Sequence, residues 1–153
     1  SISIVLPIEH NLVETITVTL VPNLQKLNGI HEWLAYSPQT LIKRYGSPSG
    51  VDFVADWGPA PLFAMQMYFE SVDLTIQYAG DNLLPNKKSS FQYCPLTTQY
   101  SSIRIWMGKN PLHPPGKGVP LEKATSLTIE EFSKLLALNP DYACFTIDGN
   151  VFR

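Results

Sequence analysis

Hydrophobic and polar positions alternate with a period of two through much of the middle of the chain, between residues 50 and 108. Three segments show it, and their apolar positions are Phe63, Met65, Met67 and Phe69, then Leu74, Ile76 and Tyr78, then Ile103, Ile105 and Met107. Successive side chains of a strand point to opposite faces of its sheet. The pattern therefore predicts a half-buried antiparallel sheet with one apolar face.

The intervening positions give this sheet a second face, which carries Gln66, Tyr68, Gln77, Arg104 and Trp106. Aromatic rings and guanidinium groups are typical of recognition surfaces. One interpretation is an open surface that binds a protein or glycan through Tyr68, Gln77, Arg104 and Trp106. The other is that the N-terminal segment or the proline-rich loop simply covers this face.

The sheet strands are expected at residues 51–57, 62–70, 74–79, 90–94 and 102–108, with a hairpin turn near 71–73. Residues 14–21 favour a further strand by their β-branched side chains, although Leu12, Ile16 and Leu20 also have helical spacing. Residues 1–7 have the length of a strand. Residues 22–35 suggest a short helix broken at Asn28-Gly29.

Two short helices carry clear end signals. Ser37 and Pro38 suit the N-cap and first position of a helix that Gly46 ends. Thr128 and Glu131 have the spacing of a capping box before a second helix, which Asn139-Pro140 ends. A last strand is expected at 142–148, and the Pro- and Gly-rich residues 109–120 are expected to be irregular.

Composition narrows the function classes. A chain of 153 residues suits a single domain, 1–153, and needs no metal or disulfide for stability. The net charge of −2 and the lack of any basic run disfavour a nucleic-acid partner. No apolar run approaches the roughly 18 residues of a membrane-spanning helix, so the protein is not expected to span a membrane. No motif for a cofactor is present.

Catalytic and metal-binding patterns are weak. His10, His31 and His113 lack a partner at ligand spacing, so no metal site is expected. Asp52 and Asp56 lie four residues apart on one strand, about 13 Å along the backbone. That exceeds the roughly 5–9.5 Å between the carboxyl groups of glycosidases. A small hydrolase built from His113, Asp52 and Asp56 remains the alternative to a binding module.

The two cysteines, Cys94 and Cys144, are too far apart in sequence for a CxxC redox or zinc motif. Two buried free thiols and one disulfide are both compatible with the sequence.

A group of uncharacterised bacterial exported or lipoprotein-like proteins shows a pattern that this chain resembles. The pattern joins a helix ending in Y-G-x-P-S-x-V, a hydrophobic strand pair, a Cys-Pro, an aliphatic-rich strand ending in Trp, and a short helix before a second Cys. The matching residues are Tyr45, Gly46, Pro48, Ser49, Val51, Cys94, Pro95, Trp106 and the segment Asn139 to Cys144. More distantly, the arrangement is similar to modules of β-lactamase inhibitor proteins and outer-membrane assembly lipoproteins. The resemblance implies export and a Cys94–Cys144 disulfide.

The sequence therefore predicts an α+β domain in which short helices pack on the apolar face of an antiparallel meander. The expected core comprises Phe63, Met65, Met67, Phe69, Leu74, Ile76, Ile103, Ile105, Phe132 and Leu136. The function that follows is a non-catalytic, exported domain that binds a protein or other partner through the second face. A cytoplasmic protein and a purely structural domain of a longer exported chain are the alternatives.

Overall fold

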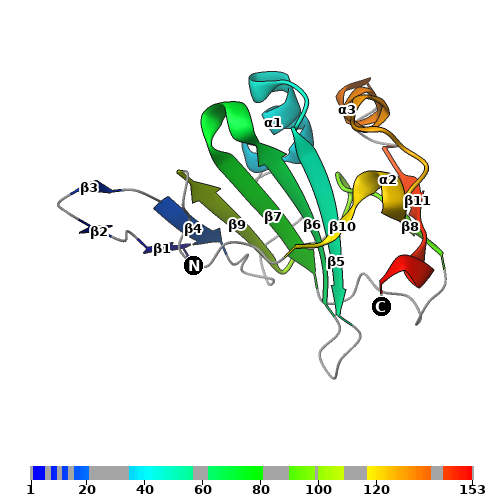
Figure 1. Ribbon diagram of the computed structural model, residues 1–153, viewed down its shortest axis with the longest axis horizontal. Coiled ribbons are helices and arrows are strands. Elements are labelled where there is room, and N and C mark those ends of the chain that lie inside the picture. The colour runs from blue at the N-terminus through cyan, green and yellow to red at the C-terminus, as the bar shows by residue number, and fades with distance from the viewer. Residues whose placement is uncertain are drawn as a thin grey trace.

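A computed structural model of the chain has the expected α+β class (Figure 1). It describes residues 35–56, 62–80, 90–98, 100–108, 117–138 and 143–152, together with the backbone of four N-terminal strands. The strands are β1 (Ile2–Val5), β2 (Ile8–Glu9), β3 (Leu12–Val13), β4 (Ile16–Leu20), β5 (Gly50–Asp56), β6 (Leu62–Phe69), β7 (Leu74–Gly80), β8 (Phe91–Tyr93), β9 (Ser102–Met107), β10 (Val119–Pro120) and β11 (Phe145–Ile147). The helices are α1 (Pro38–Tyr45), α2 (Leu121–Ala124) and α3 (Ile129–Leu138), with short 3₁₀ turns η2 (Glu70–Val72) and η3 (Gly149–Val151).

The main sheet has seven antiparallel strands in the order β1-β4-β9-β7-β6-β5-β10. Strands β5, β6, β7 and β9 confirm the predicted meander to within two residues at each end. The turn η2 and Asp73, which has a left-handed backbone with φ of 48°, close the β6–β7 hairpin where it was expected.

The predicted strand at 90–94 forms, but its assignment to the main sheet was wrong. Strand β8 pairs with β11 in a separate two-stranded sheet. Alternation identifies a strand and its buried side without naming its partner, and here the partner comes from the other end of the described chain.

The prediction that residues 109–120 are irregular was wrong for their last part. Val119 and Pro120 form β10 on the outer edge of β5, and α2 follows directly. Gly118 makes this close approach possible, because a Cβ at that position would lie 2.6 Å from the carbonyl oxygen of Phe53.

The N-terminal strands β1 and β4 extend the main sheet beyond β9, as Ile16 of β4 pairs with Met107. The expected strands at 14–21 and 1–7 are thus confirmed. Strands β2 and β3 pair with each other in a small hairpin that was not expected. The expected helix at 22–35 lies almost entirely outside the described residues.

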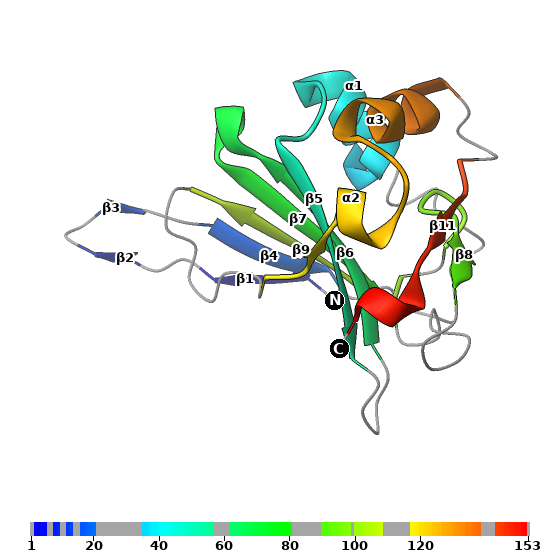
Figure 2. The same ribbon diagram turned by 45° about the vertical axis from the view of Figure 1, so that its right-hand side comes forward.

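The apolar face of the main sheet is covered by the helices and the β8–β11 sheet, which lie on the same side of it (Figure 2). All ten residues expected in the core are at most 8% exposed. The ring of Phe53 on β5 packs 5.8 Å from that of Phe63 and 6.0 Å from that of Phe145 on β11. One continuous hydrophobic core therefore joins the two sheets and the helices.

Helix α1 begins and ends as its end signals predict. The Ser37 hydroxyl accepts a hydrogen bond from the amide of Thr40 at 3.2 Å. Gly46 ends the helix with φ of 84°, and its amide donates to the carbonyl oxygen of Ile42.

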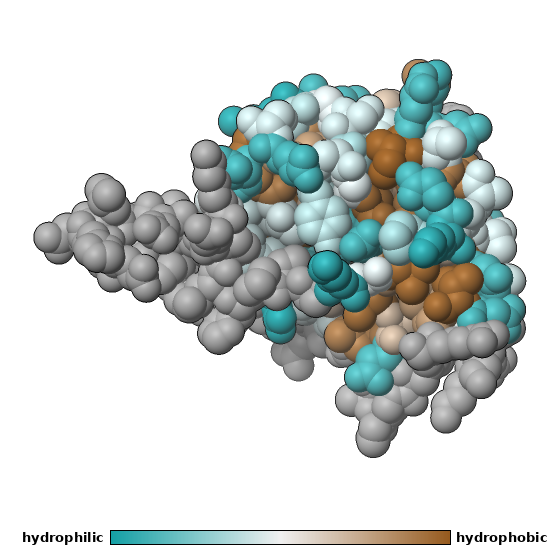
Figure 3. Space-filling model, viewed as in Figure 1, coloured by the Kyte–Doolittle hydropathy of each residue, from teal (hydrophilic) through white to brown (hydrophobic). Residues whose placement is uncertain are grey.

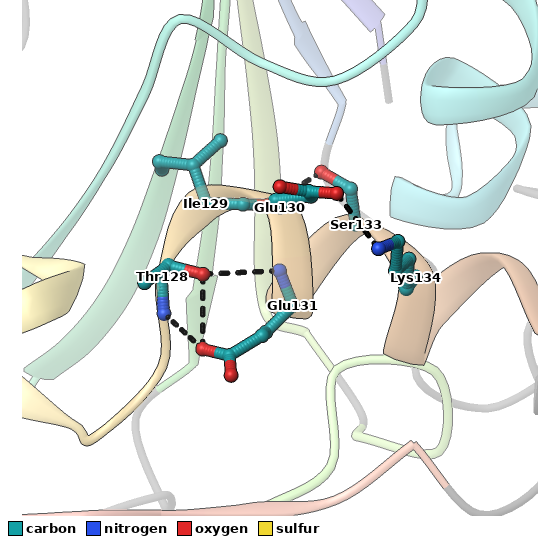
Figure 4. A network of polar contacts seen from close by, with 6 residues as sticks. All are labelled: Thr128, Ile129, Glu130, Glu131, Ser133 and Lys134. Atoms are coloured by element: carbon teal, nitrogen blue, oxygen red, sulfur yellow. Dashed lines mark hydrogen bonds and ion pairs between the residues drawn. The ribbon is translucent and has the colours of Figure 1, made fainter.

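The capping box of α3 is also confirmed (Figure 4). The amide and hydroxyl of Thr128 donate to the Glu131 carboxylate at 2.8 and 2.9 Å, and the Glu131 amide donates back to the Thr128 hydroxyl. These bonds lower the pKa of Glu131. The capping box fixes where the helix begins, and Phe132 and Leu136 on its inner face are fully buried in the core.

A disulfide joins Cys94 and Cys144 and extends the β8–β11 pairing by one position beyond Tyr93 and Phe145. The resemblance implied this bond, and the structure resolves the choice between a disulfide and free thiols that the sequence left open.

Beside it, three tyrosines form a tyrosine cluster. Tyr100 donates to the carbonyl oxygen of Pro95 at 2.7 Å, which leaves the Tyr93 hydroxyl to donate to Tyr100 at 2.8 Å. The ring of Tyr78 packs 5.1 Å from that of Tyr100. Burial raises the pKa of all three phenols, Tyr78, Tyr93 and Tyr100.

Candidate functional site

The register of the main sheet brings the second-face residues into two rows that cross the strands. The first row, here called the polar row, consists of Asp52 on β5, Gln66 on β6, Gln77 on β7 and Arg104 on β9, each directly opposite the next. The second row, two residues further along β6, runs from Tyr68 through Thr75 to Trp106. All four predicted binding residues therefore lie on one face of the sheet.

These residues differ widely in exposure. Arg104 is exposed and Gln77 and Tyr68 are half-buried, whereas Trp106 is only 4% exposed and Gln66 is fully buried. The face is thus neither wholly open nor wholly covered. Figure 3, drawn from the direction of Figure 1, shows hydrophilic and hydrophobic side chains interspersed over the side of the molecule that it presents. The Arg104 end of the polar row is the part that a partner can reach directly.

Tyr68 contacts Gln66 and Asp52, the members of the polar row on β6 and β5. Its hydroxyl lies 2.6 Å from Oε1 of Gln66 and 3.2 Å from Oδ2 of Asp52. Burial and the nearby Asp52 carboxylate both raise the pKa of Tyr68, with burial the larger cause. The phenol therefore stays protonated at neutral pH, so its hydroxyl can donate and accept hydrogen bonds.

One polar atom of the Gln66 side-chain amide makes no hydrogen bond within the described part of the chain. This atom is Nε2, which is buried and has no hydrogen-bond partner among the residues that the structure describes. Exchanging the two ends of the amide would let Tyr68 accept from Gln66 and donate to Asp52, but the carbonyl end would then lack a partner. Either way one buried polar atom stays unsatisfied. Such atoms are uncommon in folded proteins because they lose water without replacement.

Arg104 is the only positive charge among the described members of the two rows, and no hydrogen bond or ion pair holds it within the described part of the chain. The carboxylate of Asp52 is three strands away, or about 14 Å across the sheet. An exposed guanidinium that has no counter-ion among the described residues keeps its N–H donors for a ligand.

The residues of the hydrolase alternative are not brought together in what the structure describes. Asp52 accepts a hydrogen bond from Tyr68, and Asp56 lies at the exposed end of β5. His113, like His10 and His31, falls outside the described residues. No group of three or more potential metal ligands occurs among the described residues.

Two residues of the site carried little weight in the sequence. In the sequence, Asp52 is a candidate only together with Asp56, and Gln66 is only one of the second-face positions. The period-two pattern places Gln66 on this face, but only the register reveals that it lies between Asp52 and Gln77. Burial of Trp106 has no signal in the sequence, because alternation shows which face a side chain is on and not what covers it.

None of the helices that the structure describes is long and apolar enough to cross a membrane. In comparisons with known proteins, the chain matches no family model, no curated protein and no solved structure.

Proposed function

We propose that this protein is a non-catalytic, exported binding module that engages a protein partner through the second face of its main sheet. The observation that carries the proposal is the polar row. Within one line of opposed side chains, Arg104 is exposed without a counter-ion and Gln66 holds a buried polar atom without a partner, as far as the described residues go.

Unused hydrogen-bonding capacity at a surface favours binding. Arginine is enriched at protein interfaces, where its planar fork makes several directed hydrogen bonds at once. Gln77, half-buried beside Arg104, adds an amide with both donor and acceptor ends. Antiparallel strands hold the backbone of these groups rigid, so the conformational entropy lost on binding is that of the side chains alone.

The four residues first selected for binding then take different roles. Arg104 and Gln77 contact the partner. Trp106, at 4% exposure, is too buried to contact the partner directly, and Tyr68 is already engaged with Gln66 and Asp52.

Export is supported by the Cys94–Cys144 disulfide, since such bonds persist mainly in oxidising compartments. The likeness to bacterial exported or lipoprotein-like proteins stays a prediction that points in the same direction.

Site-directed photo-crosslinking tests the proposal. A photoreactive amino acid is placed at Ser102, which is half-buried on β9 and lies on the second face two residues before Arg104. The matched control places it at Gln92, exposed on β8 in the other sheet. Both proteins are irradiated in extracts of the cells that produce this protein.

We expect discrete adducts from the Ser102 position alone, and we expect Arg104→Glu to reduce their yield. The same adducts from Gln92, or a yield that Arg104→Glu leaves unchanged, would contradict the assignment of the binding surface.

A further inference from the structure

We propose that Arg104 and Gln77 form a subsite for a carboxylate, carried by an aspartate or glutamate side chain or by the C-terminus of the protein partner. The inference rests on the proposed function and names the chemistry of its ligand.

Charge gives the first reason. Arg104 is exposed, and no ion pair holds it in the described part of the chain. A carboxylate is the protein group whose geometry matches the two parallel N–H donors of a guanidinium. The cation of Arg104 therefore selects an anionic group of this shape over a neutral one.

The register gives the second reason. Gln77 on β7 lies directly opposite Arg104 on β9. Side chains at opposed positions have Cβ atoms about 5 Å apart, so both can reach one small ligand. The Gln77 amide NH₂ adds a donor to those of Arg104, and a carboxylate has lone pairs for all of them.

The buried amide of Gln66 gives the third and independent reason. Gln66 lies opposite Gln77 on the other side, and its Nε2 lacks a partner. With Oε1 of Gln66 accepting from the Tyr68 hydroxyl, Nε2 is the donor left over, and the Gln77 carbonyl oxygen can accept from it once the Gln77 NH₂ turns to the carboxylate. In this orientation of the Gln66 amide, a line of hydrogen bonds would run from Gln66 through Gln77 to the ligand. Gln66 acts here as a positioning residue.

Asp52 fixes where along the row the ligand binds. Its carboxylate lies at the opposite end and accepts a hydrogen bond from Tyr68. A second negative charge is repelled from that end and attracted to Arg104, so the row has a polarity. The subsite therefore belongs to the exposed end of the row.

A titration followed by NMR tests the subsite with acetate as the probe and acetamide as its uncharged counterpart, at constant ionic strength and neutral pH. The signals observed are the side-chain NH groups of Arg104, Gln77 and Gln66. We expect acetate to shift them saturably and acetamide to leave them in place. Arg104→Gln should weaken acetate binding about tenfold or more, the effect of losing hydrogen bonds to a charged group. The matched control Lys43→Gln, which removes an exposed cation from α1, should leave it unchanged.

Gln66→Met tests the positioning role. It should weaken acetate binding while the chemical shifts of the remaining backbone show an intact sheet, an effect that a merely structural residue would not have. Shifts that grow linearly with acetate, that acetamide reproduces, or that persist in Arg104→Gln would overturn the subsite. If acetate does not bind saturably but the Ser102 crosslinks still depend on Arg104, only the proposed ligand chemistry is wrong. If acetate binds but those crosslinks are unspecific, the proposed function is wrong.

Discussion

Replacing Gln66 with methionine should stabilise the protein, although it removes a hydrogen-bonding side chain from the middle of a sheet. Methionine has a similar volume and shape, so the packing around the fully buried position is preserved. The change removes Nε2, which is buried without a partner and costs about 1–3 kcal/mol.

The change also removes one acceptor of the Tyr68 hydroxyl, the Gln66 Oε1 at 2.6 Å, and a neutral hydrogen bond is worth about 1 kcal/mol. Tyr68 retains Asp52 as an acceptor at 3.2 Å. We therefore expect the free energy of unfolding to rise by about 1 kcal/mol net, which for a chain of this size raises Tm by roughly 2–4 °C.

Urea unfolding under non-reducing conditions measures the change, with equal m-values required before two variants are compared. Gln77→Met is the matched control, because Gln77 is half-buried and, unlike Gln66, is not among the described residues with a buried unpartnered atom. Its effect should stay within about 0.5 kcal/mol. A loss of about 1 kcal/mol or more in Gln66→Met would refute the reasoning, because it would show that the Gln66 amide is fully hydrogen-bonded in solution.

Three further outcomes are expected. Reduction of the Cys94–Cys144 disulfide, which closes a loop of 50 residues, should lower the free energy of unfolding by about 4 kcal/mol, and an unchanged urea midpoint under reducing conditions would contradict this. Gly118→Ala should lower the free energy of unfolding by about 1–3 kcal/mol, because the added Cβ pushes β10 away from the Phe53 carbonyl. Amide hydrogen exchange in β5 should then become faster, and unaltered exchange there would contradict the close approach. The tyrosine cluster should resist ionisation, because burial raises the pKa of its three phenols in the folded protein. The unfolded chain therefore ionises first, so the free energy of unfolding is at its full value below about pH 10 and falls as the pH rises above it. Tyrosinate absorbance should therefore rise in two stages, the second coinciding with unfolding, and a single stage with the fold intact would contradict the burial of the cluster.

The strands and helix ends of this fold were predictable because their signals are local. Alternation of apolar residues along β6 and β7 reports directly which side chains share the apolar face of the sheet. The hydrogen bonds of the Thr128–Glu131 capping box join residues three apart, so their spacing in the sequence is enough to identify them.

What escaped prediction depends on residues far apart in the chain. Strand β8 has the alternation of a sheet strand, yet its partner β11 lies about 50 residues away. Strand β10 has only two residues, too few to show any period. The hydrogen-bonding state of Gln66 depends on register with two neighbouring strands, and the burial of Trp106 depends on what lies over it.

The Cys94–Cys144 bond also determines what becomes of the chain when it is cut. Strand β9, with Arg104 and Trp106, lies between the two cysteines in sequence. A protease that breaks one peptide bond anywhere in this interval opens the loop but releases no fragment, because the disulfide still joins both pieces. The strand that carries the proposed carboxylate subsite therefore stays covalently attached to the rest of the protein after a single cleavage. Only cleavage combined with reduction separates them.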